Sequence, residues 1–279
     1  MPTPSLRALH VYPVKTLAGH APGEAVVEPW GLAGDRRWLL AGDDGRLVTQ
    51  REHPELAPVT AVPAGDRPEP ERGIEVTAPG RKPLTVAVPP PGDSTPVALW
   101  RDKVEAVAAD PAAGAWFSAY LGTAVRLFHL DDPARRRPVD PAYARPGETV
   151  SFADGFPLLL TTVASLDALN SLIAQGDHAD EGPLPMDRFR PNVVVDGTAP
   201  WAEDDWSRIR IGEVAFRVAK PCSRCVITTT DQRTGERGKE PLRTLARHRR
   251  FGDRLVFGQN LVPEGTGRLR LGDPVEIIA

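Results

Sequence analysis

The sequence of 279 residues has only two cysteines, Cys222 and Cys225. A single pair cannot form the disulfide framework of small secreted domains, and a chain of this length can bury a large core without cross-links. The longest apolar runs, such as 156–160, fall far short of the roughly 20 residues that span a bilayer. No basic segment followed by an apolar stretch opens the sequence, so no secretory signal is predicted. We therefore expect a cytoplasmic protein that does not enter a membrane.

The sequence also lacks an excess of charge of either sign. Lys and Arg total 34 against 37 Asp and Glu, for a net charge of −3. Such a balance provides no basic field for nucleic acid, which is therefore not an expected partner. With 41% hydrophobic and 25% charged residues, the composition is that of a soluble globular chain. The 30 prolines and 25 glycines lie between apolar segments and indicate many tight turns.

A sustained alternation of strands and helices is missing, which disfavours a doubly wound parallel sheet. Short β-like runs dominate instead, at 6–12, 37–40, 47–49, 74–77, 84–88, 104–107, 125–130, 192–196, 209–218, 226–230 and 255–262. Helices are predicted at 111–121, between Asp110 as N-cap and Gly122 as C-cap, at 165–173 and at 240–250. A hairpin with its turn at 272–274 follows. The sequence predicts a mainly β (α+β) fold of two barrel-like domains, 1–130 and 131–279, with a few short helices.

Cys222 and Cys225 form a C-x-x-C pair, and four interpretations of it stay open. A structural zinc site needs about four nitrogen or sulfur ligands, and no second C-x-x-C or close pair of histidines completes such a set. A thioredoxin-like redox pair opens a helix, whereas this one runs into β-branched residues. The pair is otherwise two inert buried thiols, or it provides one thiolate, beside Lys220 and Arg224, that binds a soft metal.

Several further segments carry basic residues, and each by itself is most simply a solvated loop. The segment 187–192 places two arginines and an asparagine around a proline at the start of a predicted strand, a pattern that also suits a phosphate or a polar heterocycle. The segments 12–16 and 34–38 each add basic side chains. The arginine runs 135–137 and 247–250 are interpreted as solvated faces or as docking surfaces for an acidic partner.

Taken together and in order, these segments resemble the MOSC family, and more narrowly the branch that contains the mitochondrial amidoxime-reducing component and its bacterial relatives. The resemblance covers almost the whole chain and rests on six motifs: 12–16 (YPVKT), 31–38 (GLAGDRRW), 49–51 (TQR), 188–192 (RFRPN), 222–225 (CSRC) and 257–260 (FGQN). It implies an N-terminal MOSC β-barrel followed by a MOSC domain. It also implies binding of molybdenum cofactor, a pterin dithiolene that carries molybdenum and a phosphate. At the level of the family it further brings an expectation of pyridoxal phosphate binding.

The resemblance assigns roles to individual residues. Cys225 is the expected metal thiolate and a catalytic residue. Asp154, because of its place beside the expected cofactor loop, is either a second catalytic candidate, as a proton-relaying or positioning carboxylate, or a turn-forming aspartate. Thr16 keeps the hydroxyl that relatives often supply with serine. Gly155 and Phe156 stand where relatives often have Thr and Ser, so only their backbone groups remain as contacts. The expected cofactor-binding residues are Lys15, Thr16, Arg36, Gly155, Phe156, Arg190, Asn192, Ser223, Arg224, Cys225 and Asn260.

The function that the resemblance implies is a molybdenum-cofactor oxidoreductase that reduces the N–O bond of small N-hydroxylated compounds. The alternative is a carrier or storage protein for the cofactor or for sulfur, without turnover of its own. No cysteine follows Cys225, so these residues cannot hold a four-cysteine iron–sulfur cluster. A reductase of this sequence would take electrons from an external flavin or iron–sulfur donor protein, and we expect it to act as a monomer.

Overall fold

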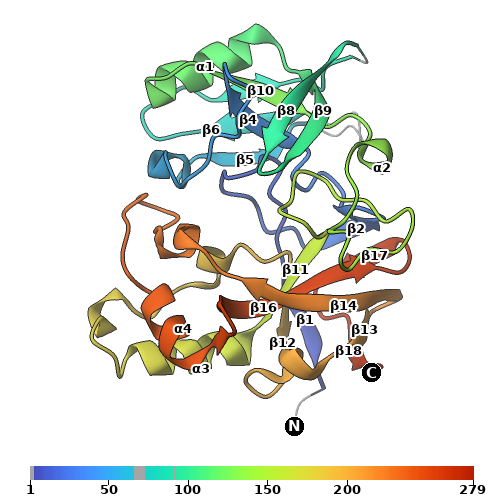
Figure 1. The fold of residues 1–279 in the computed structure, drawn as a ribbon, viewed down its shortest axis with the longest axis vertical. Coiled ribbons are helices and arrows are strands. Elements are labelled where there is room, and N and C mark those ends of the chain that lie inside the picture. The colour runs from blue at the N-terminus through green and yellow to red at the C-terminus, as the bar shows by residue number, and fades with distance from the viewer. Residues whose placement is uncertain (1–2, 66–72, 91) are drawn as a thin grey trace.

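The structure is a computed structural model that describes residues 3–65, 73–90 and 92–279. Figure 1 shows two halves stacked along the long axis, most of the first 130 residues forming the upper half and most of the remainder the lower half. Strands make up most of the regular structure in both halves, which confirms the predicted mainly β (α+β) fold. None of the helices in the described ranges is both long and apolar enough to cross a membrane.

The upper half contains two antiparallel sheets and the long helix α1, besides two short helical turns described below. The larger sheet has the order β4 (Trp38–Gly42), β10 (Val125–His129), β9 (Asp102–Ala108) and β8 (Ser94–Leu99). The smaller sheet has the order β5 (Thr60–Pro63), β6 (Ile74–Thr77) and β7 (Leu84–Val86). Helix α1 (Pro111–Leu121) packs on β10 and β7. It begins and ends as predicted, because the Asp110 carboxylate accepts a hydrogen bond from Ala112 N and Gly122 adopts a left-handed φ of 69°.

The lower half is one eight-stranded, nearly closed sheet. Its strands follow the order β1 (Ser5–Leu9), β12 (Val193–Asp196), β11 (Leu158–Thr162), β16 (Arg254–Pro263), β14 (Val214–Ser223), β13 (Arg208–Ile211) and β18 (Val275–Ile277), with β15 (Arg250–Phe251) paired to β16. Val275 N donates to Pro4 O at 2.8 Å and Leu6 N donates to Asp273 O at 2.9 Å, which brings the last strand back to the first. Helices α3 (Val163–Ile173) and α4 (Leu242–His248) pack against each other beside this sheet.

The first strands of the chain belong to the lower half. Strand β1 pairs with β12, and the sheet β17 (Gly267–Arg270), β2 (Glu24–Glu28) and β3 (Gly31–Leu32) also joins the two ends of the sequence. Leu6 and Leu9 are fully buried in the apolar core of the lower barrel, which a strand left in the upper half would not reach. The division at residues 130 and 131 stays a prediction. Strands β1, β2 and β3 precede this division in the sequence but pair with strands that follow it or with each other.

Four local predictions differ from the structure. The run 47–49, predicted as a strand, forms only an isolated bridge from Leu47 to Ala41. The predicted hairpin around 272–274 is wrong, because β17 pairs with β2 and β18 pairs with β13. The single strand predicted at 209–218 is two strands joined at Gly212, whose φ is 53°. The strand predicted at 226–230 is the short 3-10 helix η5 (Val226–Thr229). The remaining short helices are η1 (Pro54–Leu56), α2 (Pro133–Arg136), η2 (Ala179–Glu181), η3 (Met186–Phe189) and η4 (Ala202–Asp205).

Candidate functional site

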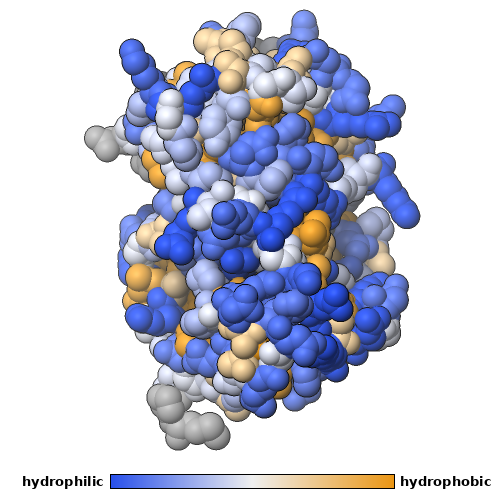
Figure 2. Space-filling model, turned by 90° about the vertical axis from the view of Figure 1, so that its left-hand side faces the viewer, coloured by the Kyte–Doolittle hydropathy of each residue, from blue (hydrophilic) through white to orange (hydrophobic). Residues whose placement is uncertain are grey.

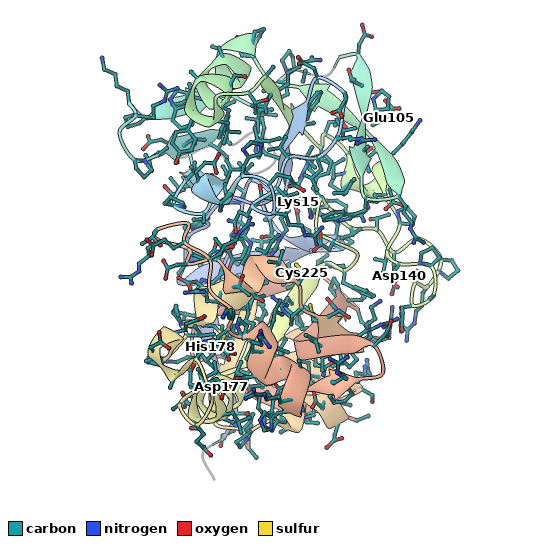
Figure 3. All side chains as sticks on the ribbon, turned by 60° about the vertical axis from the view of Figure 1, so that its left-hand side comes forward. Lys15, Glu105, Asp140, Asp177, His178 and Cys225 are labelled. Carbon is teal, nitrogen blue, oxygen red and sulfur yellow. The ribbon has the colours of Figure 1, made fainter. Side chains whose placement is uncertain are left out.

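A cavity of about 890 Å³, open to solvent, lies between the two halves, where Figure 3 places Lys15 and Cys225 near each other. Every residue that the sequence analysis assigned to the site lines this cavity. The upper half contributes Lys15, Thr16, Arg36, Thr49 and Trp100. The lower half contributes Ala153, Asp154, Gly155, Phe156, Leu158, Leu159, Arg188, Phe189, Arg190, Asn192, Cys222, Ser223, Arg224, Cys225, Ile227, Thr228 and Asn260.

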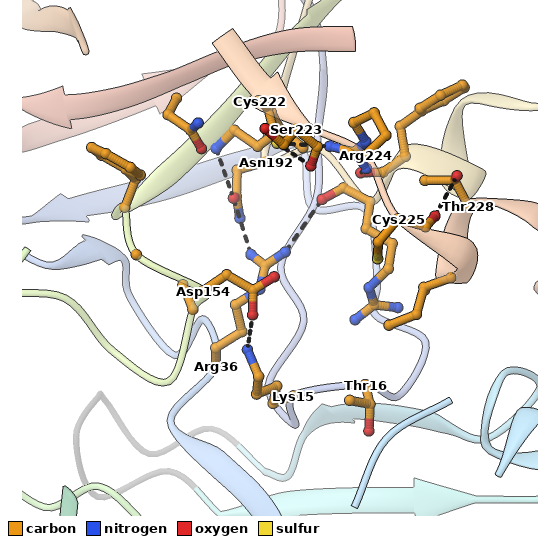
Figure 4. A pocket seen from close by; sticks show the side chains of 18 of the residues that line it. Lys15, Thr16, Arg36, Asp154, Asn192, Cys222, Ser223, Arg224, Cys225 and Thr228 are labelled. Atoms are coloured by element: carbon orange, nitrogen blue, oxygen red, sulfur yellow. Dashed lines mark hydrogen bonds and ion pairs between the residues drawn. The ribbon is translucent and has the colours of Figure 1, made fainter. Parts of the chain in front are cut away.

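The two cysteines lie at the end of β14, where the chain turns into η5. Cys222 belongs to the strand, and Cys225 is the N-cap residue of the short helix. The hydroxyls of Thr228 and Thr229 donate to the carbonyls of Cys225 and Val226, both at 2.8 Å (Figure 4 marks the Thr228 bond). Because these side chains satisfy carbonyls three residues back, a β-branched run that predicts a strand forms a helical turn. Both cysteines are unpaired and half-buried at the cavity wall.

Arg224 connects the cysteine loop to the segment around Arg190. Its Nη2 donates to Phe189 O at 2.6 Å, and its Nη1 lies 2.9 Å from Cys222 Sγ. Its Nε is buried and has no acceptor among the described residues. This guanidinium therefore contacts a sulfur and a carbonyl but no carboxylate.

Arg190 is the second cation of the lower half that faces the cavity without a carboxylate. Within the described ranges its guanidinium makes no hydrogen bond, and its carbon Cζ lies 4.3 Å from the centre of the Tyr12 ring. Burial lowers the pKa of Arg190 to about 10, so the group is still charged near neutral pH. Its φ of 53° is left-handed, a strained conformation for a residue with a side chain. The site thus contains a desolvated positive charge that no carboxylate of the described residues bonds directly.

Arg36, from the upper half, is held by several partners. Its Nη1 donates to Asp35 Oδ2 at 2.5 Å. The same Nη1 donates to Asn192 Oδ1 at 3.0 Å, a bond marked in Figure 4, and its Nη2 donates to Arg190 O at 3.2 Å. Its guanidinium also lies 4.7 Å from the centre of the Tyr12 ring. Burial raises the pKa of Tyr12 to about 12, and its hydroxyl donates to Pro191 O. Tyr12 is thus a neutral aromatic support for two guanidinium groups.

Lys15 and Asp154 form an ion pair across the two halves, with Nζ and Oδ1 2.6 Å apart (Figure 4). Burial lowers the pKa of Lys15, and the Asp154 carboxylate counteracts that shift. The protein around the cavity desolvates the Asp154 carboxylate and works against its ionisation. The charge and hydrogen bond of Lys15, with a bond from Trp100 Nε1, nevertheless hold the pKa of Asp154 well below its usual range. Three-quarters of the Asp154 side chain is exposed, because it faces the open cavity. Asp154 is therefore an ionised carboxylate near neutral pH.

The loop that carries Asp154 is held by hydrogen bonds to its carbonyl groups, while several of its backbone N–H groups make no hydrogen bond to the described residues. Arg137 is buried and donates to the carbonyls of Ser151, Ala153 and Asp154, and Lys15 Nζ donates to Phe152 O at 2.7 Å. In the part of the chain that the structure describes, no acceptor bonds the backbone N–H groups of Asp154, Gly155 and Phe156, which all line the cavity. Successive N–H groups of this kind bind an anion where the backbone turns them toward one point.

Asn192, Asn260 and Thr16 have structural bonds in addition to their place at the cavity. Asn192 is buried, accepts from Arg36 and from Leu159 N, and donates to His10 O. Asn260 Nδ2 donates to Lys220 O at 3.3 Å. Thr16 has a left-handed φ of 75°, and its carbonyl accepts from Gln50 Nε2. These residues support the wall of the cavity as well as lining it.

Among the ten lining residues that were not site candidates are Thr49, Trp100, Arg188 and Thr228. Three of these four fall inside or beside motifs that the sequence analysis quoted, so proximity to a motif was the available signal. Trp100 stands in no motif, and nothing in the sequence marks it.

Neither arginine run is a continuous basic surface. In the run 247–250, Arg249 is buried and paired with Asp204 at 2.5 Å. In the run 135–137, Arg137 is buried, and the side chains of residues 135 and 136 lie outside the described part of the structure.

No group of three or more His, Cys, Asp or Glu that could hold a metal ion occurs among the described residues. Figure 2 shows a largely hydrophilic face with scattered apolar residues.

Two family models match the chain. The MOSC N-terminal beta barrel domain matches residues 3–124, and the MOSC domain matches residues 147–276. The chain is 32% identical to mitochondrial amidoxime-reducing component 1 of Homo sapiens, over 97% of this chain and 82% of that protein. It is 30% identical to the mitochondrial amidoxime reducing component 2 of Rattus norvegicus, over 95% and 80% of the two chains.

A second kind of relative matches only in part. The chain is 30% identical to the molybdenum cofactor sulfurase of Oryza sativa subsp. japonica, over 91% of this chain but 32% of that protein. Both kinds of relative match across the upper and the lower half, in agreement with the order of the two family models. The chain belongs to the MOSC family, in the group of proteins that join an N-terminal MOSC β-barrel to a MOSC domain.

Proposed function

We propose that this protein binds molybdenum cofactor in the cavity between its halves and reduces the N–O bond of small N-hydroxylated compounds. The observation that supports this most directly is the convergence of residues from six separate motifs on one cavity that contains an unpaired cysteine. The names of the relatives supply the chemistry: several are amidoxime-reducing components, and others are molybdenum cofactor sulfurases.

The charges around the cavity fit the proposed cofactor. Molybdenum cofactor is anionic at its phosphate and at its dithiolene sulfurs, and an anion in a partly buried site needs fixed cations and hydrogen-bond donors. Arg190 and Arg224 are cations without a carboxylate partner, and the Nε of Arg224 is a buried donor without an acceptor. The free N–H groups of residues 154–156 add further donors. The uncompensated groups are thus those that an anionic ligand would satisfy.

Each residue then has a definite role in the proposed site. Cys225 provides the thiolate, a soft ligand suited to a redox-active metal. Arg190, Arg224 and the backbone of 154–156 hold the anionic parts, and Lys15 and Arg36 offer positive charge fixed in place by their own ion pairs. Asp154, with its low pKa, acts as the counter-ion of Lys15 and is a weak proton donor. The positioning role proposed for Asp154 is therefore favoured over the relay.

The proposed reaction is a balanced two-electron reduction. An amidoxime, R–C(NH₂)=N–OH, takes up two electrons and two protons to give the amidine, R–C(NH₂)=NH, and water. The bound cofactor supplies the two-electron chemistry, and the protein orients the substrate and sets the charge around it. With two cysteines, these residues provide no four-cysteine cluster, and we propose that the electrons come from a flavin or iron–sulfur donor.

A pyridoxal phosphate site is less well supported by the same groups. That cofactor needs a lysine amine available for a Schiff base, and Lys15 Nζ is held by both Asp154 and Phe152 O. Lys220, near the cavity, is paired with Asp140 at 2.9 Å. Cytoplasmic location and a monomeric state stay predictions.

The test is production of the protein in a host that makes molybdenum cofactor, followed by molybdenum quantification and a benzamidoxime reduction assay with an artificial electron donor. About one molybdenum per chain and formation of benzamidine are expected. Molybdenum without reduction would favour a carrier or storage role, which the match to part of a cofactor sulfurase also suits. A protein without molybdenum would overturn both assignments.

A further inference from the structure

Trp100 occupies a backbone position that disfavours it. The strands β8 and β9 pair up to Leu99 and Asp102, so Trp100 and Arg101 form a two-residue hairpin loop. The φ of Trp100 is 58°, in the left-handed region that side chains rarely adopt. Tight hairpin loops usually place glycine, asparagine or aspartate at a position with positive φ. A bulky residue held there suggests a role other than stability.

The side chain of Trp100 faces the cavity and is held in one orientation. It lines the cavity, and its Nε1 donates to Asp154 Oδ1 at 3.0 Å, which connects the hairpin of the upper half to a loop of the lower half. The guanidinium of Arg51 lies 4.2 Å from the centre of the indole and supports it. Even so, Trp100 remains 45% exposed. An oriented aromatic surface therefore stays available beside the site.

No other large, exposed apolar side chain among the described residues lines the cavity. Val26, Val226, Phe251, Leu271, Ile277 and Ile278 are the others with large exposure, and none belongs to the wall. Phe156 and Phe189 do line it, but they are at least nine-tenths buried, and Phe189 stacks on Phe257 at 4.0 Å. An entering planar molecule meets one accessible aromatic face, that of Trp100.

We propose that Trp100, supported by Arg51, is the residue that sets substrate preference, by stacking on planar, conjugated N-hydroxylated compounds in preference to small aliphatic ones. This inference rests on the proposed function. Stacked aromatic pairs gain energy beyond the area they bury, and the cation on the indole adds to the rigidity of the platform. Asp154 acts here as a positioning residue, because its carboxylate sets the angle of the indole.

The conformation of Trp100 provides a sharp test, because glycine at this position removes the ring and also relieves the strain. For Trp100→Gly, kcat/KM for benzamidoxime is expected to fall about tenfold, mainly through KM. For acetamidoxime, which has no ring, it should stay within about threefold. Molybdenum content and Tm should not fall. Arg51→Gln should cause a smaller loss of the same preference, since the backbone N–H and carbonyl of Arg51 are bonded elsewhere and only the side chain changes.

Trp116 is the matched control. It also lies near a guanidinium, that of Arg81 at 5.8 Å, and its Nε1 is also bonded, to Lys82 O, but it is remote from the cavity wall. Trp116→Ala should leave the ratio of the two substrates unchanged. Equal losses of both substrates in Trp100→Gly, a lower molybdenum content or a lower Tm would each overturn the proposal, since Trp100 would then serve the cofactor or the fold.

A binding measurement separates this inference from the proposed function. Benzamidoxime is titrated calorimetrically into the oxidised, molybdenum-loaded protein without a reductant, so that no turnover is needed. Weaker binding to Trp100→Gly than to the natural sequence supports the platform even if neither protein reduces the compound, a result that would overturn only the reductase assignment. Equal binding to both proteins would overturn the platform while leaving reduction intact.

Discussion

The two sides of the cavity hold their cations differently. The upper half offers Lys15, paired with Asp154, and Arg36, paired with Asp35. In the lower half Arg188 is paired with Asp231, but Arg190 makes no hydrogen bond among the described residues, and the buried Nε of Arg224 has no acceptor there. The upper side therefore uses its cations to build the interface between the halves, and the lower side keeps positive charge for a ligand.

Because of this difference, the paired cations mainly fix the geometry of the site, and the unpaired cations mainly contribute binding free energy toward an anionic ligand. A cation that already has a carboxylate partner adds little net charge to the site, but its geometry is fixed before a ligand arrives. A desolvated cation without a partner costs folding free energy that an anionic ligand then recovers. Removal of cations from the two sides should therefore have different effects on stability, even where the effects on the cofactor are similar.

The largest expected effect is on the lower side, at the cysteine pair. Cys225→Ser should abolish reductase activity, because a hydroxyl oxygen is a poorer ligand than a thiolate for a soft metal. Cys222→Ser should be milder, since its hydroxyl can still accept the bond that Arg224 Nη1 now makes to Cys222 Sγ. Activity and molybdenum content are measured for both variants. Full activity in Cys225→Ser, or total loss in both, would contradict a single metal thiolate.

The next effect tests the comparison itself. Arg36→Ala and Arg190→Ala should each weaken cofactor binding by about one to two decades, since each removes a charge-assisted contact of roughly 1.5–3 kcal/mol. Arg36→Ala should also lower the free energy of unfolding of the cofactor-free protein by about 3 kcal/mol, because Asp35, only 1% exposed, loses its cation. Arg190→Ala should not lower it.

The measurements are molybdenum retained after dialysis and denaturant unfolding of the cofactor-free protein. The exposed Arg233, away from the cavity wall, is the matched control, and Arg233→Ala should change neither quantity. Equal destabilisation by Arg36→Ala and Arg190→Ala would remove the distinction between the two sides.

A third prediction concerns the acid stability of the upper half. His129 on β10 is buried against Trp38, and burial lowers its pKa to about 3 from 6.5. The unfolded chain takes up a proton below pH 6.5 and the folded chain does not, so the stability tied to neutral His129 is complete above pH 6.5 and is lost as the pH falls toward 3.

The loss tied to His129 should be on the order of 3 kcal/mol at pH 4. His129→Gln should therefore flatten the decline of unfolding free energy between pH 6.5 and 4, whatever its effect at neutral pH. Unfolding curves at several pH values measure this slope. An unchanged slope would mean that the acid sensitivity comes from other groups.

The smallest expected effect is at the ion pair that joins the two sides. Burial lowers the pKa of Lys15 and the Asp154 carboxylate counteracts this, so in Asp154→Asn the pKa of Lys15 should fall further. The charge of Lys15 would then be lost at a lower pH, and the alkaline limit of cofactor retention should move down. Lys15→Met, which has no amine to titrate, should not show this loss of cofactor at alkaline pH. Molybdenum retained across pH 6–10 is the measurement, and an unchanged or higher limit in Asp154→Asn would contradict the coupling.

Local signals in the sequence predicted much of the molecule correctly. At helix α1 the N-cap residue and the proline stand next to the first turn and the glycine stands next to the last turn. Short-range rules were therefore enough to place both ends of the helix. Most of the site residues were identified because they lie in a short motif of the family, and residues 154–156 because they occupy a stretch that relatives also use. Every one of them lines the cavity. Information carried by neighbouring residues, or by a motif, can be read without the fold.

Only the tertiary structure decided which segments meet. The turn at 272–274 exists, but its flanking strands pair with β2 and β13, because partner choice depends on which buried faces fit and not on the turn. The threonines after Cys225 form a helical turn because their hydroxyls find carbonyls. Trp100 reaches Asp154, and Arg190 remains without a carboxylate, through contacts between residues far apart in the sequence. Whether a charged group finds a partner, and whether a side chain faces the cavity, depends on distances in space. The separation of two residues in the sequence does not determine those distances.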